Sequence, residues 1–236
     1  NDPRLPVYFQ PVTDGDNKGE YRGVANGMPN PQQEDYKAMS SPNVQEKSTD
    51  SPLRWMMASE VAFLRAEGAM RGWTAEMGGT AEEFYNKGIE LSFLENGLSA
   101  DAAARYAADE TSKPTDFTDV SAANTKYNIS ALGKIAIKWN SGASEEEQLE
   151  RIITQKWIAM FPNGTEAWSE FRRTGYPRLF PVRYNYPSGV DTNKQIRRMV
   201  FPQSEYSNNG AAVQEAVKLL GGPDNGGTKL WWDKKN

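Results

Sequence analysis

Two consecutive helical patterns joined by a short polar loop constrain the fold of this chain more than any other feature. The first, PLRWMMASEVAFLRAEGAMRGW, spans residues 52–73 and is long enough for about five turns of helix. On a helical projection three of its charged residues fall on one narrow stripe and three of its alanines on the opposite side. The stripe comprises Glu60, Glu67 and Arg71, and the alanines are Ala58, Ala62 and Ala69. Because an alanine face lets another helix approach closely, we expect this helix to be buried over most of its circumference.

The second pattern, AEEFYNKGIELSFLEN, begins at a capping box formed by Thr80 and Glu83. Its apolar residues face one way and its charged residues face the other, and Gly97 marks its end. Two antiparallel helices joined in this way resemble one tetratricopeptide-type pair, although no second copy about 34 residues away is visible. The sequence therefore predicts a mainly α fold that contains one such pair.

The rest of the chain is predicted to contain further helices and a few short strands. Ser99 is expected to cap a short helix that runs through Ala108, and a second capping box at Ser144 and Glu147 opens a longer helix. One face of that helix carries Leu149, Ile152, Ile153, Trp157 and Met160. The other expected elements are a helix through Trp168 and Phe171 that ends at Gly175, a last helix over residues 211–220, and strands at residues 134–139 and 196–202.

These patterns divide the chain into three segments. Residues 1–52 form a loop-rich opening segment, with many Pro and Gly and little periodicity. Residues 53–98 form the helix pair, and residues 99–236 form a loop-rich helical region with a docked C-terminal tail. The tail contains Trp231 and Trp232, whose burial would contribute roughly 8–10 kcal/mol as an upper bound. This exceeds the cost of about 6 kcal/mol for ordering the tail, so we expect the tryptophan pair to pack on the body.

The composition excludes several classes of function. The chain contains neither cysteine nor histidine, so it cannot itself supply disulfides, thiolate nucleophiles, His-based catalytic triads or the usual zinc ligands. Carboxylate chemistry, Lys or Tyr bases and oxygen-ligated metals remain. Lysine and arginine are scattered in a chain of net charge −4, which argues against nucleic acid as a partner. No apolar run approaches the roughly 18 residues of a membrane span.

Three blocks of sequence occur in a characteristic order. They are LRWMMASEVAFLRAEGA, ERIITQKWIAMFPNGTEAWSEFRRTGYPRL, and FPQSEYSNNG followed by a terminal LWWD. In this order they resemble the SusD/RagB family of outer-membrane nutrient-binding lipoproteins of Bacteroidetes. The segment DPRLPVYF, Asp2 to Phe9, is similar to one branch of that family. The resemblance covers essentially the whole chain.

The resemblance implies a SusD-like fold of the α/α superhelix type, and it implies that the chain is the C-terminal half of a longer protein. The N-terminal half in such proteins carries a lipid anchor, which would provide the only link to the membrane. The implied function is capture of oligosaccharides or peptides at the extracellular face of the outer membrane and their delivery to a SusC-like TonB-dependent transporter. No catalytic residue, cofactor or metal is implied.

Candidate ligand contacts come from the residues themselves, because contacts in this family vary with the ligand. Aromatic rings in Pro- and Gly-rich connections are suitably placed to stack on sugar rings. The candidates are Tyr8, Phe9, Tyr21, Tyr36, Trp139, Tyr184 and Tyr186, and RYNYPSG at residues 183–189 is preferred. Pinning of the loops is the more frequent role of such residues and stays open as the alternative.

Other conspicuous residues are assigned structural roles. Trp55, Trp157 and Trp168 lie in amphipathic patterns and are expected in the core. Arg172, Arg173 and Arg178 are expected to stabilise a helix end rather than bind an acidic ligand. The loop that begins at Asp14 departs from an EF-hand, because Lys18 and Ala25 occupy ligand positions, and only a looser calcium site remains conceivable.

Two other function classes remain as alternatives. A glycoside hydrolase needs two carboxylates about 5 to 9.5 Å apart, and Glu166 and Glu170, one helical turn apart, fit that spacing. Many other surface pairs among 31 acidic residues also fit it. A helical-repeat scaffold that binds another protein is the second alternative, and the loop-rich second half argues against it.

Overall fold

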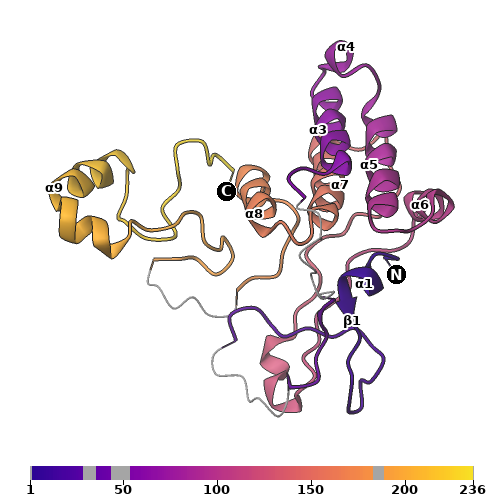
Figure 1. Ribbon diagram of the computed structural model, residues 1–236, viewed down its shortest axis with the longest axis horizontal. Helices are drawn as coiled ribbons and strands as arrows, with labels where there is room; N and C mark the ends of the chain where they lie inside the picture. The colour runs from indigo at the N-terminus through magenta and orange to yellow at the C-terminus, as the bar shows by residue number, and fades with distance from the viewer. Residues whose placement is uncertain (1, 29–35, 44–53, 183–188, 236) are drawn as a thin grey trace.

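A computed structural model describes residues 2–28, 36–43, 54–182 and 189–235 of the chain. The fold is mainly α, as predicted, and Figure 1 shows the order of its elements. In chain order these are α1 (Leu5–Tyr8), β1 (Phe9–Gln10), β2 (Ser41–Pro42), α3 (Ala58–Met70), α4 (Thr74–Met77), α5 (Ala81–Glu95), α6 (Ala100–Ala107), the 3₁₀ helix η1 (Ala122–Tyr127), α7 (Glu145–Ala159), α8 (Gly164–Thr174) and α9 (Gln203–Leu219). No helix in the described ranges is long and apolar enough to cross a membrane.

Helices α3, α5 and α7 pack together and enclose the main hydrophobic core. Phe63, Tyr85, Ile89 and Phe93 are fully buried between α3 and α5. The two helices approach so closely that a Cβ atom on Gly88 would lie 2.6 Å from the Phe63 ring. The predicted antiparallel pair is therefore present, and glycine supplies its closest contact.

The predicted helix boundaries are confirmed where side chains cap the backbone. Both capping boxes are present, at Thr80 and Glu83 and at Ser144 and Glu147. Ser99 accepts a hydrogen bond from Ala102 N–H at the start of α6. Without such a cap the prediction was poorer. The first helix begins at Ala58 rather than near residue 52, and the last begins at Gln203 rather than residue 211, with a kink at Asn209.

The two glutamates of the charged stripe are buried, contrary to the expectation for a polar stripe on a helix, whereas Arg71 at the end of α3 is exposed. Glu60 and Glu67 are each only 6% exposed, because α7 and α8 place cations against them. Lys156 Nζ lies 3.7 Å from a Glu60 oxygen, and Arg173 donates two hydrogen bonds to the Glu67 carboxylate, at 2.7 and 2.6 Å. The interface between these helices is thus held by ion pairs as well as by apolar contacts.

The tryptophan assignments were largely wrong. Trp55 lies before α3 and is 85% exposed, Trp157 is 37% exposed, and Trp168 is half-buried. By contrast, Leu149, Ile152, Ile153 and Met160 are buried as predicted. Trp157 is exposed because it lies at the edge of that apolar stripe, about 80° from Leu149 at 100° per residue.

The opening segment is more regular than predicted. Residues Leu5–Tyr8 form one helical turn, and β1 pairs with β2 in an antiparallel ladder. Arg4 is fully buried and attaches this segment to the helical body, as it donates hydrogen bonds to Ser92 on α5, Tyr106 on α6 and Gln155 on α7. The local sequence around Arg4 could not predict this attachment, because all three acceptors are distant from Arg4 in the sequence.

Neither predicted strand in the second half forms. Residues 134–139 and 196–202 are extended in part but have no ladder partner. Their carbonyl groups accept side-chain hydrogen bonds instead: Tyr85 Oη donates to Ile137 O, and Trp168 Nε1 donates to Ile196 O. The alternation of apolar residues therefore reflects packing of an irregular segment against helices.

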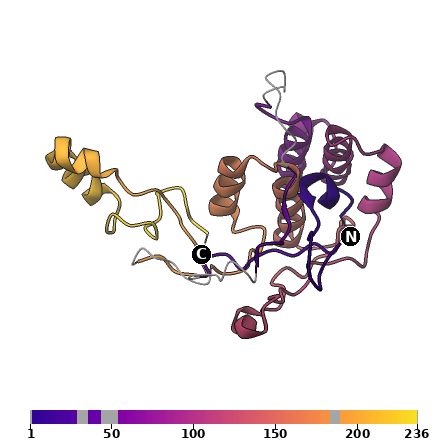
Figure 2. The same ribbon diagram turned by 60° about the horizontal axis from the view of Figure 1, so that its bottom comes forward.

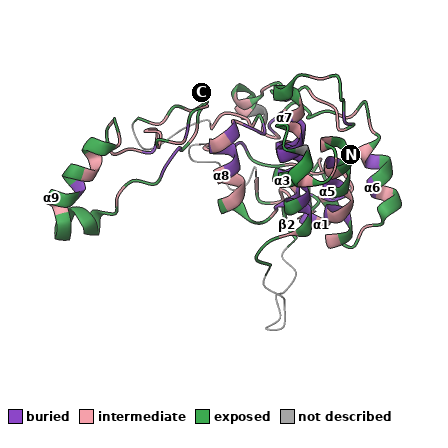
Figure 3. Cartoon of the chain, turned by 90° about the horizontal axis from the view of Figure 1, so that it is seen from above, coloured by how far each residue is buried: buried purple, intermediate pink, exposed green. Residues whose placement is uncertain are grey.

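Helix α9 lies apart from the α3, α5 and α7 body in the views of Figures 1 and 2. Figure 3 shows that most of its surface is exposed. The C-terminal tail returns toward α8, but not through the tryptophan pair. Trp231 is 82% exposed, Trp232 is half-buried, and Asp233 is buried in an ion pair with Arg197 at 2.7 Å. The expected burial of both rings was wrong because a carboxylate, rather than an indole, anchors the tail.

Candidate functional site

Three adjoining hollows surround the C-terminal half of α7. The end pocket has a volume of about 240 Å³ and is lined by Tyr106, Lys113, Glu150, Thr154, Ile158 and Arg178, among others. The aromatic groove has a volume of about 420 Å³ and includes Tyr8, Phe9, Trp157, Phe161, Asn163 and Ala167. The loop hollow has a volume of about 290 Å³ and includes Asn26, Phe117, Ile129, Trp157, Phe180 and Gln195.

Adjacent residues of α7 separate these hollows. Ile158 lines both the end pocket and the aromatic groove, and Trp157 lines both the aromatic groove and the loop hollow. Successive helical residues point about 100° apart, so one short stretch of α7 provides a wall to all three. The hollows therefore form a row rather than three isolated cavities.

The aromatic groove is built by α1 and β1 on one side and by the turn after α7 on the other. The Phe161 ring lies 4.9 Å from the Tyr8 ring and 5.0 Å from the Phe9 ring, measured between centroids. Tyr8 is buried, whereas Phe9 and Phe161 are half-buried. The exposed part of Trp157 completes a surface of aromatic rings, and Asn163, whose side-chain oxygen caps α8 by accepting from Glu166 N–H, adds an amide to the same groove. Such a surface combines apolar faces with a hydrogen-bonding group.

The loop hollow continues this chemistry on the other side of Trp157. Phe117 and Phe180 lie with their ring centroids 6.2 Å apart. Two amide side chains, Asn26 and Gln195, also line it, although Gln195 Nε2 donates to Phe180 O. The aromatic groove and the loop hollow thus both present aromatic rings and side-chain amides.

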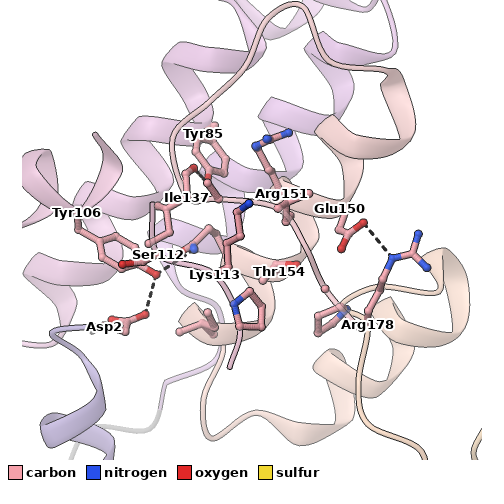
Figure 4. A pocket seen from close by; sticks show the side chains of 17 residues that line it. Asp2, Tyr85, Tyr106, Ser112, Lys113, Ile137, Glu150, Arg151, Thr154 and Arg178 are labelled. Atoms are coloured by element: carbon pink, nitrogen blue, oxygen red, sulfur yellow. Dashed lines mark hydrogen bonds and ion pairs between the residues drawn. The ribbon is translucent and has the colours of Figure 1, made fainter. Parts of the chain in front are cut away.

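The end pocket has a different character, as Figure 4 shows. Its floor is the face of α7 that carries Glu150, Thr154 and Ile158. Arg178, from the segment after α8, donates from Nε to Glu150 Oε2 at 3.1 Å. That hydrogen bond and the Glu150 charge raise the pKa of Arg178. The pocket therefore combines an apolar interior with charged groups at its edge.

Asp2 lines both the end pocket and the aromatic groove, and it is held in place by Arg4. Arg4 Nη2 and Nε donate to its two carboxylate oxygens at 2.7 and 3.0 Å, and Tyr106 Oη donates to it at 2.9 Å. Burial alone would raise the pKa of Asp2, but the hydrogen bonds and charge of Arg4 outweigh it and leave that pKa lowered. Asp2 is therefore an ionised, fixed acceptor at the boundary of the two hollows.

Of the predicted ligand residues that the structure describes, it brings Tyr8 and Phe9 together, in the aromatic groove. Trp139 is 7% exposed and packs on Tyr85, with ring centroids 5.2 Å apart, and it lines a separate hollow beside α5 and α6 rather than any of these three. Tyr21 is half-buried and lines none of the three hollows.

Tyr36 also lies outside the row of hollows. Its hydroxyl donates to Asp119 and accepts from Asn124, which fits the alternative role of pinning a loop. Tyr184 and Tyr186 lie outside the described residues, so the preferred segment at residues 183–189 stays a prediction.

Two aromatic residues of the groove were missed by the sequence interpretation. Trp157 was assigned to the core because it lies within a helix. Phe161 lies directly before Pro162 in the turn that follows α7, and it meets the same criterion of a loop aromatic that selected Tyr8 and Phe9. That signal was available in the sequence.

The arginines and carboxylates of α8 form ion pairs within the body. Arg173 bonds to Glu67 and Glu170, and Arg172 lies over the Trp168 ring at 3.6 Å and donates to Arg197 O. These contacts fit the structural role predicted for them. Lys156 is 1% exposed and lies 3.1 Å from Glu170 Oε1 and 3.5 Å from Glu166 Oε1.

The carboxylates considered for hydrolysis, Glu166 and Glu170, thus serve as counterions of a buried lysine and line none of the three hollows. Among the described residues no group of three or more acidic side chains is arranged to hold a metal ion.

Comparison with known families identifies the fold. The model of the family described as SusD-like, Susd and RagB outer membrane lipoprotein, matches residues 1–233. The chain therefore belongs to the SusD/RagB family, as the order of its sequence blocks indicated. No curated protein matches the sequence.

Solved structures of SusD homologues superpose on the whole chain. A chitin-binding SusD homolog from Flavobacterium johnsoniae is 43% identical with a TM-score of 0.89, and the match covers 100% of this chain and 47% of that one. A SusD-like protein from Bacteroides thetaiotaomicron is 44% identical with a TM-score of 0.90, covering 100% and 48%. A homolog from Bacteroides vulgatus is 38% identical with a TM-score of 0.89, covering 100% and 47%. The chain thus spans about half the length of these structures.

Proposed function

We propose that this chain is part of a nutrient-binding protein that captures oligosaccharides, and that the row of hollows along α7 holds the ligand. The observation that carries the proposal is that Trp157 and Ile158, adjacent on α7, border all three hollows, so the hollows lie side by side along one stretch of helix. An oligosaccharide is itself a row of rings, so a row of adjoining hollows fits it better than a single deep pocket.

The chemistry of the groove supports a sugar ligand. Sugar rings present C–H faces that pack on aromatic rings, and hydroxyl groups that bond to amides and carboxylates. Phe9, Phe161 and Trp157 supply partly exposed rings, and Asn163 supplies an amide. Binding sites of this kind are largely preformed and place a few polar groups among apolar ones. A similar chain, the homolog from Flavobacterium johnsoniae, is described as chitin-binding.

Membership of a family of outer membrane lipoproteins supports the proposed location and partner. We place the protein at the extracellular face of the outer membrane, held by a lipid anchor, and pair it with a SusC-like TonB-dependent transporter that takes up the captured ligand. We propose that the protein binds the sugar without cleaving it, and the engagement of Glu166 and Glu170 by Lys156 disfavours that carboxylate pair as a hydrolytic site.

Tryptophan fluorescence and calorimetry with plant, host and microbial oligosaccharides, and with peptides, test the proposal. The 236-residue chain is compared with the longest natural polypeptide that contains it. Replacement Trp157→Ala is expected to weaken oligosaccharide binding by about tenfold or more, as for a central aromatic contact. Trp73→Ala is the matched control, because Trp73 is 58% exposed and lines none of the three hollows.

Three outcomes would refute the proposal. Equal oligosaccharide binding by Trp157→Ala and Trp73→Ala would show that the ligand does not bind in the row of hollows along α7. Saturable binding of peptides, without binding of oligosaccharides, would show that the ligand is a peptide. Release of shorter sugars during prolonged incubation would show a hydrolase, and circular dichroism of each variant separates loss of binding from loss of fold.

A further inference from the structure

The end pocket is chemically distinct from the rest of the row. The aromatic groove and the loop hollow present rings and amides, whereas the end pocket presents charge around a small apolar space. Its volume of about 240 Å³ is below the roughly 300–1,000 Å³ of a drug-sized ligand site. It therefore suits one sugar ring rather than a length of chain.

Two cationic groups stand at the edge of this pocket. Lys113 is exposed, and no ion pair to it is found in the part of the chain that the structure describes. Arg178 has a half-exposed side chain and uses Nε for Glu150. Figure 4 shows Lys113 beside Ser112, and the Arg178–Glu150 pair to the right of them. The Arg178 guanidinium also lies 5.4 Å from the centroid of the Tyr176 ring, and its half-exposed side chain leaves part of the group open to a ligand.

Both carboxylates of the pocket are paired within the protein. Asp2 is paired with Arg4, and Glu150 is buried and paired with Arg178. Arg151 donates to the carbonyl groups of Lys138 and Glu147 and is only 7% exposed. Among the described residues that line the pocket, Lys113 is therefore the exposed cation without an ion pair, and the net charge of the pocket lining is positive.

We propose that the end pocket is a subsite for a sugar residue that carries an anionic group, either a carboxylate or a sulfate, with that group bound between Lys113 and Arg178. This inference rests on the proposed function, of which it defines the ligand class. The apolar side chains of Ile158, Pro114 and Pro177, which line the pocket, pack on the sugar ring. Charge-assisted hydrogen bonds from ammonium and guanidinium groups are shorter and stronger than neutral ones, so the anionic group determines the preference.

The test compares oligosaccharides of equal length that differ only in charge. Calorimetry is performed with oligogalacturonates, with the matching neutral galactose oligomers, and with singly sulfated forms of the latter. The protein is expected to bind the anionic oligomers about threefold to tenfold more tightly than the neutral ones, the lower limit reflecting the exposure of Lys113. Raising the salt concentration from about 50 to about 300 mM is expected to weaken only the anionic ligands.

Variants separate a direct contact from a structural effect. Lys113→Gln is expected to remove most of the preference for anionic oligomers while leaving the affinity for neutral ones unchanged. Lys134→Gln is the matched control, because Lys134 is an exposed lysine of the same connection that does not line the pocket. The double replacement Arg178→Gln with Glu150→Gln removes the other cation without leaving its partner carboxylate buried and unpaired. It is expected to reduce the preference further.

The outcomes distinguish this inference from the proposed function. Tight binding of neutral oligomers with no gain for anionic ones would overturn the inference and leave the function intact. Equal losses for neutral and anionic oligomers in Lys113→Gln would also overturn it. Failure to bind any oligosaccharide would overturn both. A preference for galacturonate over sulfated galactose, or the reverse, identifies which anionic group the pocket takes.

Discussion

Arg4 shows how a single residue determines the geometry of the candidate site. It is fully buried, it holds Asp2 at the boundary of two hollows, and it contacts α5, α6 and α7 at once. Its guanidinium also lies over the rings of Phe93 and Tyr106, at 5.1 and 5.2 Å. The positions of Tyr8 and Phe9, four and five residues further on, depend on this attachment.

Replacement Arg4→Leu is expected to lower the free energy of unfolding by about 3–5 kcal/mol, because it leaves Asp2 and several buried polar groups without their partner. Urea denaturation followed by tryptophan fluorescence measures the loss. Arg22→Leu is the control, since Arg22 forms an exposed pair with Glu20, and a change within about 0.5 kcal/mol is expected for such a surface pair. Equal effects of the two replacements would contradict the role assigned to Arg4.

The sequence indicated Tyr8 and Phe9 but gave no reason to expect the role of Arg4. A local pattern carries information about aromatic rings in a Pro-rich connection, so those rings were found. The partners of Arg4 on α5, α6 and α7 lie 88 to 151 residues away in the chain, and no periodicity encodes such contacts. The packing of Trp139 on Tyr85 of α5 was hidden for the same reason, and its role in ligand binding stays a prediction.

At the scale of helices, the pKa values of the two buried glutamates of α3 are shifted in opposite directions, so their contributions to stability depend on pH in opposite ways. Burial alone would raise the pKa of Glu67, but hydrogen bonds and charges from Arg173 and Arg71 outweigh it and lower that pKa below the ordinary 4.5. Burial is the main cause of the raised pKa of Glu60, which the more distant Lys156 only partly offsets. The ionised form of Glu67 therefore stabilises the fold, whereas the ionised form of Glu60 does not.

The lowered pKa of Glu67 means that its contribution to stability is present above about pH 4.5 and is lost as the pH falls through its folded-state value. Glu67→Gln is expected to lower the free energy of unfolding by about 2 kcal/mol at pH 7 and by less at pH 3. Urea denaturation at both pH values measures this difference.

Glu60→Gln provides a control on the same helix. Since the folded-state pKa of Glu60 is raised, its stabilising contribution is that of the protonated form, which is present below pH 4.5 and lost as the pH rises through the raised value. This replacement is therefore expected to leave stability unchanged or to increase it at pH 7. A larger loss at pH 7 for Glu60→Gln than for Glu67→Gln would contradict this account.

Capping residues and apolar stripes made most helices predictable, and tertiary contacts explain the exceptions. The boxes at Thr80 and Ser144 place helix starts correctly, because the bonds involved span only three residues. The strand predicted at residues 134–139 failed because its backbone bonds to side chains of α5 and α7 rather than to a neighbouring strand. The row of hollows was equally inaccessible to sequence reasoning, since it arises only where α7 meets three separate connections.

For the molecule as a whole, a few polar contacts connect the region of α9 to the helical body. Arg197 bonds to Asp233 and to Arg172 O of α8, and Trp168 of α8 bonds to Ile196 O. Beside α9, Asp224 is paired with Arg198 and accepts from Tyr206 Oη. Ile196 and Arg197 thus contact α8 directly, and Asp233, near the end of the chain, is joined to α8 through Arg197.

Asp233→Ala is expected to release the C-terminal tail, because it leaves Arg197 buried with its charge unpaired. Hydrogen exchange of residues 229–235 should increase by about a hundredfold or more, which corresponds to a local loss of about 3 kcal/mol. Exchange in α5 should not change. Lys234→Ala alters the neighbouring exposed residue and should leave the tail protected, and similar exchange in both variants would exclude Asp233 as the anchor.

The arrangement of Trp157 and Ile158 also bears on how such proteins diversify. Both residues belong to one helix, while the other walls come from separate segments of the chain, around residues 2–9, 112–114, 133–137, 161–164 and 179–181. Connections of this kind tolerate insertion and exchange far better than the helices that support them. Ligand specificity can therefore change by substitutions in one connection at a time, while the helix that borders all three hollows keeps their spacing constant.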